Sequence, residues 1–453
     1  MTRLLIALLC FVACAPVRPP ASNDVTLVLR LPEGAPENGV ITTIRFTEDE
    51  VDAGVHRQPA QLFTWLERLE RVKDLDDTAN TITLSLPAAR EPTSLQVFVD
   101  GAGHGLDALF TPPGVAHGLV RVPANGPGSG VLTFKRPTPR EACAGPRLQQ
   151  VVLDAPELVR AEDDGRHTLC VFLPSSYERS PTKRYPVVFV FPGFSGHAAQ
   201  NDGFSARGLF DSLGAAAGVE VILVGVETRI AEGTSYLARS ERFGDWEGYV
   251  LNRVLPEVDR RFRTLPTRAA YGHSTGGWNA LSLAVRRPGL FAAVGASSPD
   301  PLDLEAWLLQ GGVSKPRWWH WQRAEQRLGG RGQFRSWALS WSPRRDGLDW
   351  LFDDAGVLRP AVYASWKEAS PLARLADAEV PRLSGRLVLT AGRNDMFDLF
   401  TPTLRFVEAA RARGVEVRWV PTELDHFGAT EERFTPLIAF LLDQLVKEES
   451  VRR

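Results

Sequence analysis

From about residue 148 onward, apolar runs of strand length alternate with helical stretches. The run YPVVFVFPG at 185–193 is apolar almost without interruption, which is typical of a strand buried on both faces of a sheet. Strands that alternate with helices predict a mostly parallel sheet joined by right-handed crossovers, with helices on both faces. We therefore expect an α/β fold over residues 148–453.

The expected elements of this region follow from apolar runs and turn residues. Strands are expected at 166–174, 185–193, 219–227, 267–272, 291–298, 386–392 and 415–421, and helices at 246–262, 276–287, 402–413 and 431–447. Residues 300–375 interrupt the alternation and hold eight of the chain's 12 tryptophans, namely Trp307, Trp318, Trp319, Trp321, Trp337, Trp341, Trp350 and Trp366. A cap that shapes a substrate pocket is favoured here, and a satellite core on the sheet edge is the alternative.

The region before residue 136 has a different pattern, with mostly strands and one helix. Alternating strands are expected at 25–31, 39–46, 81–86, 94–100, 117–122 and 130–134, and one helix at 59–74, with Leu62, Leu66, Leu69 and Val72 on one face. These patterns predict a β-sandwich-like domain over 24–135, followed by a linker over 136–147. A spacer is favoured as its role over a sugar-binding module.

The N-terminus has the pattern of an export signal. Arg3 precedes an apolar run over 4–13, which is short for a membrane span and typical of a signal peptide over 1–13. The run Val12-Ala13-Cys14 resembles a bacterial lipobox, although Phe11 stands where leucine is usual. This predicts a lipid on Cys14, a tether over 14–23, and an exported bacterial lipoprotein held at the outer membrane, in the periplasm or at the cell surface. A plain cleaved signal with a chance cysteine is the alternative.

Charge and cysteine content narrow the range of partners. The chain has 52 Lys and Arg against 54 Asp and Glu, a net charge of −2, and no basic run, which argues against nucleic-acid binding. Cys143 and Cys170 form a disulfide or remain two free thiols. No two cysteines or histidines have the spacing of metal ligands, so we expect neither a metal site nor a cofactor.

The stretch Gly272-His273-Ser274-Thr275-Gly276 fits G-x-S-x-G between an expected strand and an expected helix. Two glycines permit a strained turn there, and the helix N-terminus favours developing negative charge, so Ser274 is predicted to be a nucleophile. The N–H of Thr275 is the first expected oxyanion donor. The N–H of Phe194, in the loop after the strand at 185–193, is the second. His273 is expected to be structural.

The base and acid are expected late in the chain. His426 follows the strand at 415–421, precedes the last helix, and is the only histidine C-terminal to residue 320. Asp395 follows the strand at 386–392 and is expected to orient His426. Asp398 is the second candidate acid and Asp300 the third. The order Ser274, Asp395, His426 is the order expected of α/β-hydrolases.

Residues from about 148 to 448 resemble the esterase D family, also called the putative esterase family, of α/β-hydrolases. The matching stretches are YPVVFVFPGFSG, FGDWEGYVLNRVLPEVDRRFRT, YGHSTGGWNALSLAVRRPGLFAAVGASS, LTAGRNDMF and LDHFG. The family includes enterochelin esterases, feruloyl esterases and antigen 85 mycolyltransferases. This chain departs from it at Pro192-Gly193, where His-Gly is usual, and proline has no N–H to donate.

The resemblance implies a serine carboxylesterase that forms an acyl-enzyme on Ser274 and acts on a small-molecule or saccharide ester. Three alternatives stay open: an acyltransferase that uses the same site, a serine peptidase, and a non-catalytic surface lipoprotein. The acyl and alcohol parts of the substrate and the oligomeric state are not predicted.

Overall fold

The structure is a computed structural model. It describes residues 25–32, 35, 39–53, 68–75, 81–86, 89–100, 115–124, 127–134, 143–156, 158, 166–199, 202–308, 317–344, 347–377 and 379–452. The described residues up to 134 form one compact unit, and those from 143 onward form a second. The signal sequence, the lipobox cysteine Cys14 and the tether expected at the N-terminus all lie outside the described residues.

The second unit is built on an eight-stranded sheet in the order β22-β21-β18-β17-β11-β12-β10-β9. The strands from β22 to β12 pair in parallel, and the β12–β10 and β10–β9 pairs are antiparallel. The bounds are β9 Leu148–Asp154, β10 Arg166–Phe172, β11 Tyr185–Phe191, β12 Ile222–Val226, β17 Thr264–His273, β18 Ala293–Ser297, β21 Leu387–Gly392 and β22 Val417–Thr422. The predicted mostly parallel sheet is confirmed.

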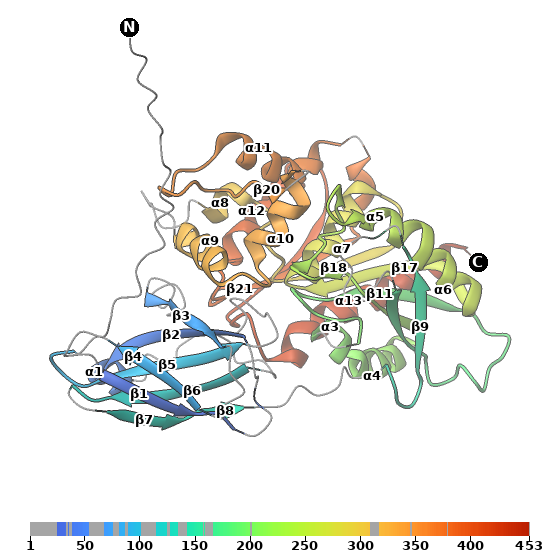
Figure 1. Cartoon of the computed structure of the whole chain (residues 1–453). Coiled ribbons are helices and arrows are strands. Elements are labelled where there is room, and N and C mark those ends of the chain that lie inside the picture. The colour runs from blue at the N-terminus through green and yellow to red at the C-terminus, as the bar shows by residue number, and fades with distance from the viewer. Residues whose placement is uncertain are drawn as a thin grey trace, which may run out of the picture. The chain divides into compact units, whose positions relative to one another are not determined.

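Helices cover both faces of this sheet (Figure 1). On one face, α4 (Arg207–Ala217) and α13 (Thr430–Arg452) share a hydrophobic core with β10, β11, β12 and β17. On the other, α7 (Thr275–Arg286) packs against β17, β18 and β11, and α12 (Phe400–Arg411) packs against β21. Every residue of β11 is buried, as the uninterrupted apolar run predicts.

Two further helical stretches belong to this unit. The helix expected over 246–262 is a continuous stretch of α5 (Trp246–Tyr249), a π-helical segment (Val250–Val254) and α6 (Leu255–Arg261). The short α3 (Asp202–Ser205) precedes α4. The sequence analysis did not predict α3, α4 or β9.

Cys143 and Cys170 are joined in a disulfide with a Cα–Cα distance of 5.4 Å.

The segment between β18 and β21 is mainly helical. It contains α8 (Leu304–Leu308), α9 (Arg317–Leu328), α10 (Gln333–Trp341), the hairpin of β19 (Pro343–Arg344) with β20 (Gly347–Leu348), and α11 (Pro360–Ala369). Its tryptophans pack largely on one another: the rings of Trp307 and Trp318 stack with centroids 3.6 Å apart, and Trp337 packs on Trp341. Five of the eight are buried, namely Trp307, Trp318, Trp321, Trp337 and Trp366. Most of the tryptophans therefore serve as the insertion's own core.

The first unit contains two sheets. One has the order β4-β1-β7, and the other has the order β3-β2-β5-β6-β8. The bounds are β1 Val25–Arg30, β2 Gly39–Thr47, β3 Glu70–Leu75, β4 Thr81–Leu86, β5 Thr93–Asp100, β6 Val115–Val122, β7 Gly128–Val131 and β8 Thr133–Phe134, with the short helix α1 at Glu48–Asp52. Inward-facing residues of both sheets form one hydrophobic cluster, to which β1, β4, β5 and β6 contribute most.

The helix expected over 59–74 is wrong at residues 70–74, whereas Arg68 is helical. The helical pattern over 59–74 predicted helix at residues 70–74, but Glu70–Leu75 is the strand β3, which pairs antiparallel with β2. A backbone ladder to a neighbouring strand overrides the local helical spacing there. Residues 59–67 of the predicted helix lie outside the described residues.

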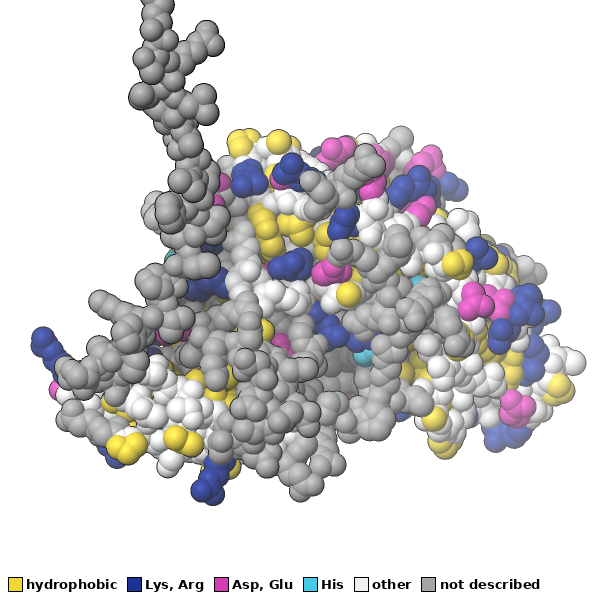
Figure 2. Space-filling view, in the orientation of Figure 1, with side chains coloured by type: hydrophobic (Ala, Val, Ile, Leu, Met, Phe, Trp, Pro, Cys, Tyr) yellow, Lys and Arg dark blue, Asp and Glu magenta, His cyan; other side chains and the backbone are white. Residues whose placement is uncertain are grey.

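The described surface shows no strong charge asymmetry on the face in Figure 2, where dark blue Lys and Arg side chains are interspersed with magenta Asp and Glu. In the part of the chain that the structure describes, no helix combines the length and apolar character needed to cross a membrane.

Candidate active site

Ser274 lies at the turn between β17 and α7. Its backbone has φ 56° and ψ −129°, a strained conformation for a residue with a side chain, and its N–H donates to the carbonyl of Ser297 at 2.9 Å. The chain therefore enters along a strand, turns sharply at the serine and leaves as a helix, the local geometry that places a nucleophile at the top of a sheet.

Two glycines allow this turn. A Cβ on Gly276 would overlap the carbonyl oxygen of Phe191, and a Cβ on Gly272 would overlap the backbone of Gly276. The first turn of α7 thus approaches β11 and β17 more closely than any side chain permits. The glycines of the G-x-S-x-G pattern are required by packing as well as by backbone freedom.

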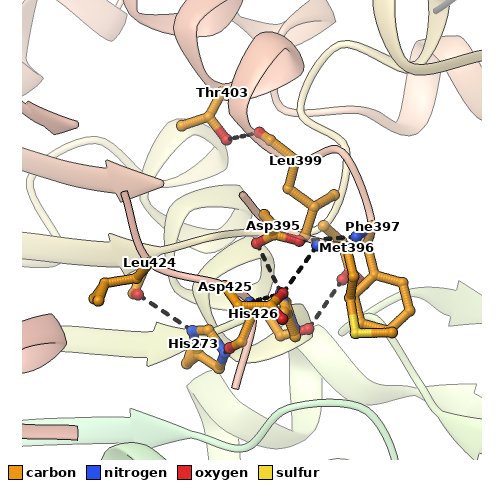
Figure 3. Close-up of polar contacts among 12 residues, drawn as sticks. His273, Asp395, Met396, Phe397, Leu399, Thr403, Leu424, Asp425 and His426 are labelled. Atoms are coloured by element: carbon orange, nitrogen blue, oxygen red, sulfur yellow. Dashed lines mark hydrogen bonds and ion pairs between the residues drawn. The ribbon is translucent and has the colours of Figure 1, made fainter. Parts of the chain in front are cut away.

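His426 and Asp395 meet at the same end of the sheet (Figure 3). Asp395 follows β21, His426 lies between β22 and α13, and Nδ1 of His426 is 2.9 Å from Oδ2 of Asp395. The exposed fractions of the two side chains are 2% and 0%. A carboxylate on Nδ1 fixes the proton on that nitrogen and leaves Nε2 to exchange a proton with a hydroxyl.

Side-chain carboxylates accept hydrogen bonds from backbone N–H groups in both loops, and the bond between Met396 and Asp425 joins the two loops. Oδ1 of Asp425 accepts from the N–H of His426 at 2.6 Å and from the N–H of Met396 at 3.1 Å, while Oδ1 of Asp395 accepts from the N–H of Phe397 at 3.0 Å (Figure 3). Asp398, the second candidate acid, has a backbone N–H that donates to the carbonyl of Asp395, whereas the ring of His426 is held by Asp395.

His273 links the serine turn to the histidine loop. Its Nε2 is 3.0 Å from the carbonyl oxygen of His426, and its Nδ1 is 3.2 Å from Oγ of Ser297. Since a carbonyl only accepts, Nε2 carries the proton and Nδ1 accepts from the Ser297 hydroxyl. Burial holds the pKa of His273 well below its usual range, so the ring is neutral. It supports the position of His426.

The loop after β11 lies beside the serine. A Cβ on Gly193 would be 3.8 Å from Cβ of Ser274, and the ring of Phe194 packs on Gly233, where any side chain would overlap it. The backbone N–H of Phe194 therefore belongs to a loop that lies beside Ser274. Thr275, the other predicted donor, is the first residue of α7, where N–H groups have no acceptor within the helix.

Asp300, the third candidate acid for His426, has Ser274 as a partner. It contacts the serine instead of the histidine: Oδ1 is 3.4 Å from Oγ of Ser274. Tyr236 and Gln333 both donate to its other oxygen. Sequence reasoning missed these two residues, because neither lies in a motif or at a strand end.

A family model described as "Putative esterase" matches residues 162–434, more than half of the 453-residue chain. No curated protein matches the chain.

Solved structures similar to this chain include a ferulic acid esterase, with 17% identity over 66% of this chain and 98% of that one, at a TM-score of 0.46. An S-formylglutathione hydrolase from Agrobacterium tumefaciens has 17% identity over 67% of this chain and 95% of that one, at a TM-score of 0.42. The siderophore hydrolase EstA from Aspergillus nidulans has 12% identity over 69% of this chain and 99% of that one, at a TM-score of 0.42.

The family match agrees with the parallel sheet described above and supports an ester-hydrolysing enzyme. This chain belongs to the putative esterase family, whose fold is that of the α/β-hydrolases.

Proposed function

We propose that this protein is an exported serine carboxylesterase in which Ser274 carries the acyl group. The observation that carries the proposal is the buried pair of His426 and Asp395, whose ring nitrogen and carboxylate oxygen are 2.9 Å apart, at the same sheet edge as a serine on a strained turn. A buried base with a fixed tautomer is what a serine hydroxyl needs in order to attack.

In the acylation step, Nε2 of His426 takes the hydroxyl proton of Ser274 while Oγ attacks the ester carbonyl carbon. The negative charge that develops on the carbonyl oxygen is accepted by the backbone N–H groups of Thr275 and Phe194. The tetrahedral intermediate then expels the alcohol, which takes the proton from His426, and an acyl-enzyme remains.

In the deacylation step, His426 removes a proton from water, and the hydroxide attacks the acyl carbonyl. The carboxylic acid leaves, and Ser274 recovers its proton from His426. Asp395 stays ionised and stabilises the imidazolium that forms in both steps. An alcohol that replaced water would give acyl transfer by the same chemistry.

The proposal is tested with short-chain p-nitrophenyl esters and the purified protein. We expect hydrolysis by the wild type and loss of activity in Ser274→Ala, by a factor on the order of 10⁶ if the triad acts as a unit. Ser212→Ala is the matched control, because Ser212 lies exposed on α4 and bonds only within its own helix. Equal activity of Ser274→Ala and Ser212→Ala would overturn the proposal.

The same preparation separates the alternatives. Cleavage of peptides without cleavage of esters would indicate a peptidase. Faster loss of ester when an alcohol is added, with a new ester as product, would indicate acyl transfer. Absence of both activities and of covalent labelling by a fluorophosphonate would indicate a non-catalytic protein.

We also propose that Cys14 carries a lipid and anchors the protein to a membrane after export. The apolar run over 4–13 and the Val12-Ala13-Cys14 motif support this. Cys14→Ser should move the protein from the membrane fraction to the soluble fraction. Cys10→Ser is the control, since Cys10 would leave with the signal peptide. An unchanged membrane fraction in Cys14→Ser would refute the anchor.

For the first unit, we propose a β-sandwich-like domain that serves as a spacer between the anchor and the hydrolase. The shared core of its two sheets supports this. Deleting residues 24–135 should leave the rate on soluble esters close to that of the intact protein. A large fall in kcat with the hydrolase unit still folded would contradict the spacer role.

A further inference from the structure

A buried carboxylate lies directly beside the nucleophile. Oδ2 of Asp300 accepts from the hydroxyl of Tyr236 at 2.6 Å, from Oγ1 of Thr275 at 2.7 Å and from Nε2 of Gln333 at 2.8 Å. Its second oxygen, Oδ1, is 3.4 Å from Oγ of Ser274. Only 5% of the residue is exposed. The mechanism described above assigns this group no role.

The two oxygens of Asp300 are not equivalent. Oδ2 is saturated by three donors, whereas Oδ1 has only the long contact with the Ser274 hydroxyl among the described residues, which leaves it free to accept another hydrogen bond. All four neighbours are hydroxyl or amide donors, which stabilise an ionised carboxylate, whereas burial raises the pKa of Asp300. Burial and the adjacent charge of Asp300 raise the pKa of Tyr236 well above its usual range, so the phenol remains a donor.

This charge stands close to any bound ester. The reacting carbonyl carbon must approach Oγ of Ser274 to within bonding distance, and Oδ1 of Asp300 is 3.4 Å from that atom. A group on the carbon next to the carbonyl therefore lies a few ångströms from an anionic oxygen with acceptor capacity. An ammonium or hydroxyl group there gains a hydrogen bond, whereas a carboxylate there meets a like charge in a site of low dielectric.

We propose that Asp300 is a specificity-determining residue, which selects esters whose acyl group carries an ammonium or hydroxyl group next to the reacting carbonyl and rejects esters with an anionic group there. The inference rests on the proposed esterase function and names the substrate class of that site. Gln333, which donates to the same carboxylate, comes from α10 of the helical insertion. The insertion thus contributes to selectivity through this side chain.

The test uses four ethyl esters that differ only at the carbon next to the carbonyl: ethyl butanoate, its hydroxy and amino derivatives, and the monoethyl ester of ethylmalonic acid, which is anionic. Acid release is followed in a pH-stat at a pH where the amine is protonated. For the wild type we expect kcat/KM to fall in the order ammonium, hydroxyl, unsubstituted, carboxylate. We call the ratio of kcat/KM for the ammonium ester to kcat/KM for the carboxylate ester the span. It should be roughly a hundredfold, the size expected for close charges in a partly desolvated site.

Asp300→Asn removes the charge and keeps the shape, so the hundredfold span should collapse to a few-fold while ethyl butanoate is still hydrolysed. Tyr236→Phe is the matched control: it removes a hydroxyl that donates to Asp300 and accepts from Gln333, and it keeps the charge of Asp300, so the span should persist. A span that is absent in the wild type, or unchanged in a folded Asp300→Asn, overturns the inference. If Asp300→Asn does not fold, the span is measured in Asp300→Ser, with the same criterion.

Failure of the proposed function has a separate signature. If the wild type hydrolyses no ester and a fluorophosphonate does not label Ser274, the esterase assignment falls, and the inference falls with it. If labelling and hydrolysis of ethyl butanoate are normal but the charged and neutral esters react alike, only the inference is overturned.

Discussion

Asp395 and His426 form a buried hydrogen-bonded pair, with Oδ2 and Nδ1 2.9 Å apart and almost no exposed surface on either side chain. The pair joins the loop after β21 to the loop after β22, so the orientation of the histidine depends on a residue 31 positions earlier in the chain. The role proposed for Asp395 follows from this contact.

Asp395→Asn should lower kcat by a factor on the order of 10³–10⁴, because an amide cannot hold the tautomer that places the acceptor at Nε2. KM should change little, since Asp395 is buried behind the histidine. Steady-state kinetics on a p-nitrophenyl ester provide the measurement. Asp398→Asn is the matched control and should stay within a few-fold of the wild type. A larger loss in Asp398→Asn than in Asp395→Asn would reverse the assignment.

Gly233→Ala should lower kcat, by at most the factor of about 10²–10³ that follows the complete loss of one oxyanion donor. Gly233 has φ +136°, and a Cβ there would overlap the ring of Phe194, whose N–H is the proposed donor. Gly208→Ala is the control, because Gly208 lies on α4 with nothing within 4 Å of a built Cβ. Equal kcat in the two variants would show that Phe194 does not depend on this packing.

Much of the site could be predicted because it depends on chain order and strand ends. The carboxyl ends of parallel strands meet at one edge of a sheet, so residues that directly follow β17, β21 and β22 were expected to converge there. The order Ser274, Asp395, His426 predicts the three residues without any knowledge of the loops, and the contact of Asp395 with His426 is present in the structure. Seven of the eight strands of the large sheet follow from their apolar runs, and α7, α12 and α13 follow from helical periodicity.

The contact of Asp300 with Ser274 could not be predicted in this way. It depends on the backbone path after β18, where Ser298 has φ 36°, and on a glutamine from an insertion whose packing has no simple sequence period. The helical pattern over 59–74 failed at Glu70–Leu75 because pairing with β2 is a long-range interaction. Both are tertiary effects that local patterns do not encode.

The stability of the hydrolase unit should depend on pH through Glu325. This buried side chain of α9 accepts from Nε1 of Trp321 at 2.7 Å and from the N–H groups of Phe334 and Arg335 at the start of α10. Burial raises its pKa to about 7. A carboxyl whose pKa is higher in the folded state stabilises the fold at low pH, and that stabilisation is lost as pH rises from about 4.5, its ordinary value, through about 7.

Glu325→Gln cannot titrate, so the free energy of unfolding should lose this part of its pH dependence, on the order of 3 kcal/mol between pH 5 and 8. Urea unfolding at a series of pH values measures it. Glu368→Gln, at an exposed position of α11, should leave the wild-type slope intact. A slope equal to that of the wild type in Glu325→Gln would contradict the assignment.

The disulfide between Cys143 and Cys170 closes a loop with a sequence separation of 27 residues. Replacing both cysteines by alanine should lower the free energy of unfolding by about 3–4 kcal/mol, chiefly by relaxing the constraint on the unfolded chain. The measurement is urea unfolding with and without reductant. Reductant should destabilise the wild type and leave the double variant unchanged, and an equal response of both proteins would argue against the bond.

The central claim is that Ser274 is a nucleophile activated by His426. It is tested most directly by mass spectrometry of the intact protein and its peptides after treatment with a fluorophosphonate. The account predicts one adduct on Ser274, no adduct in Ser274→Ala, and labelling slowed by several orders of magnitude in His426→Ala. An adduct on another serine, or labelling of Ser274 at the wild-type rate in His426→Ala, would contradict it.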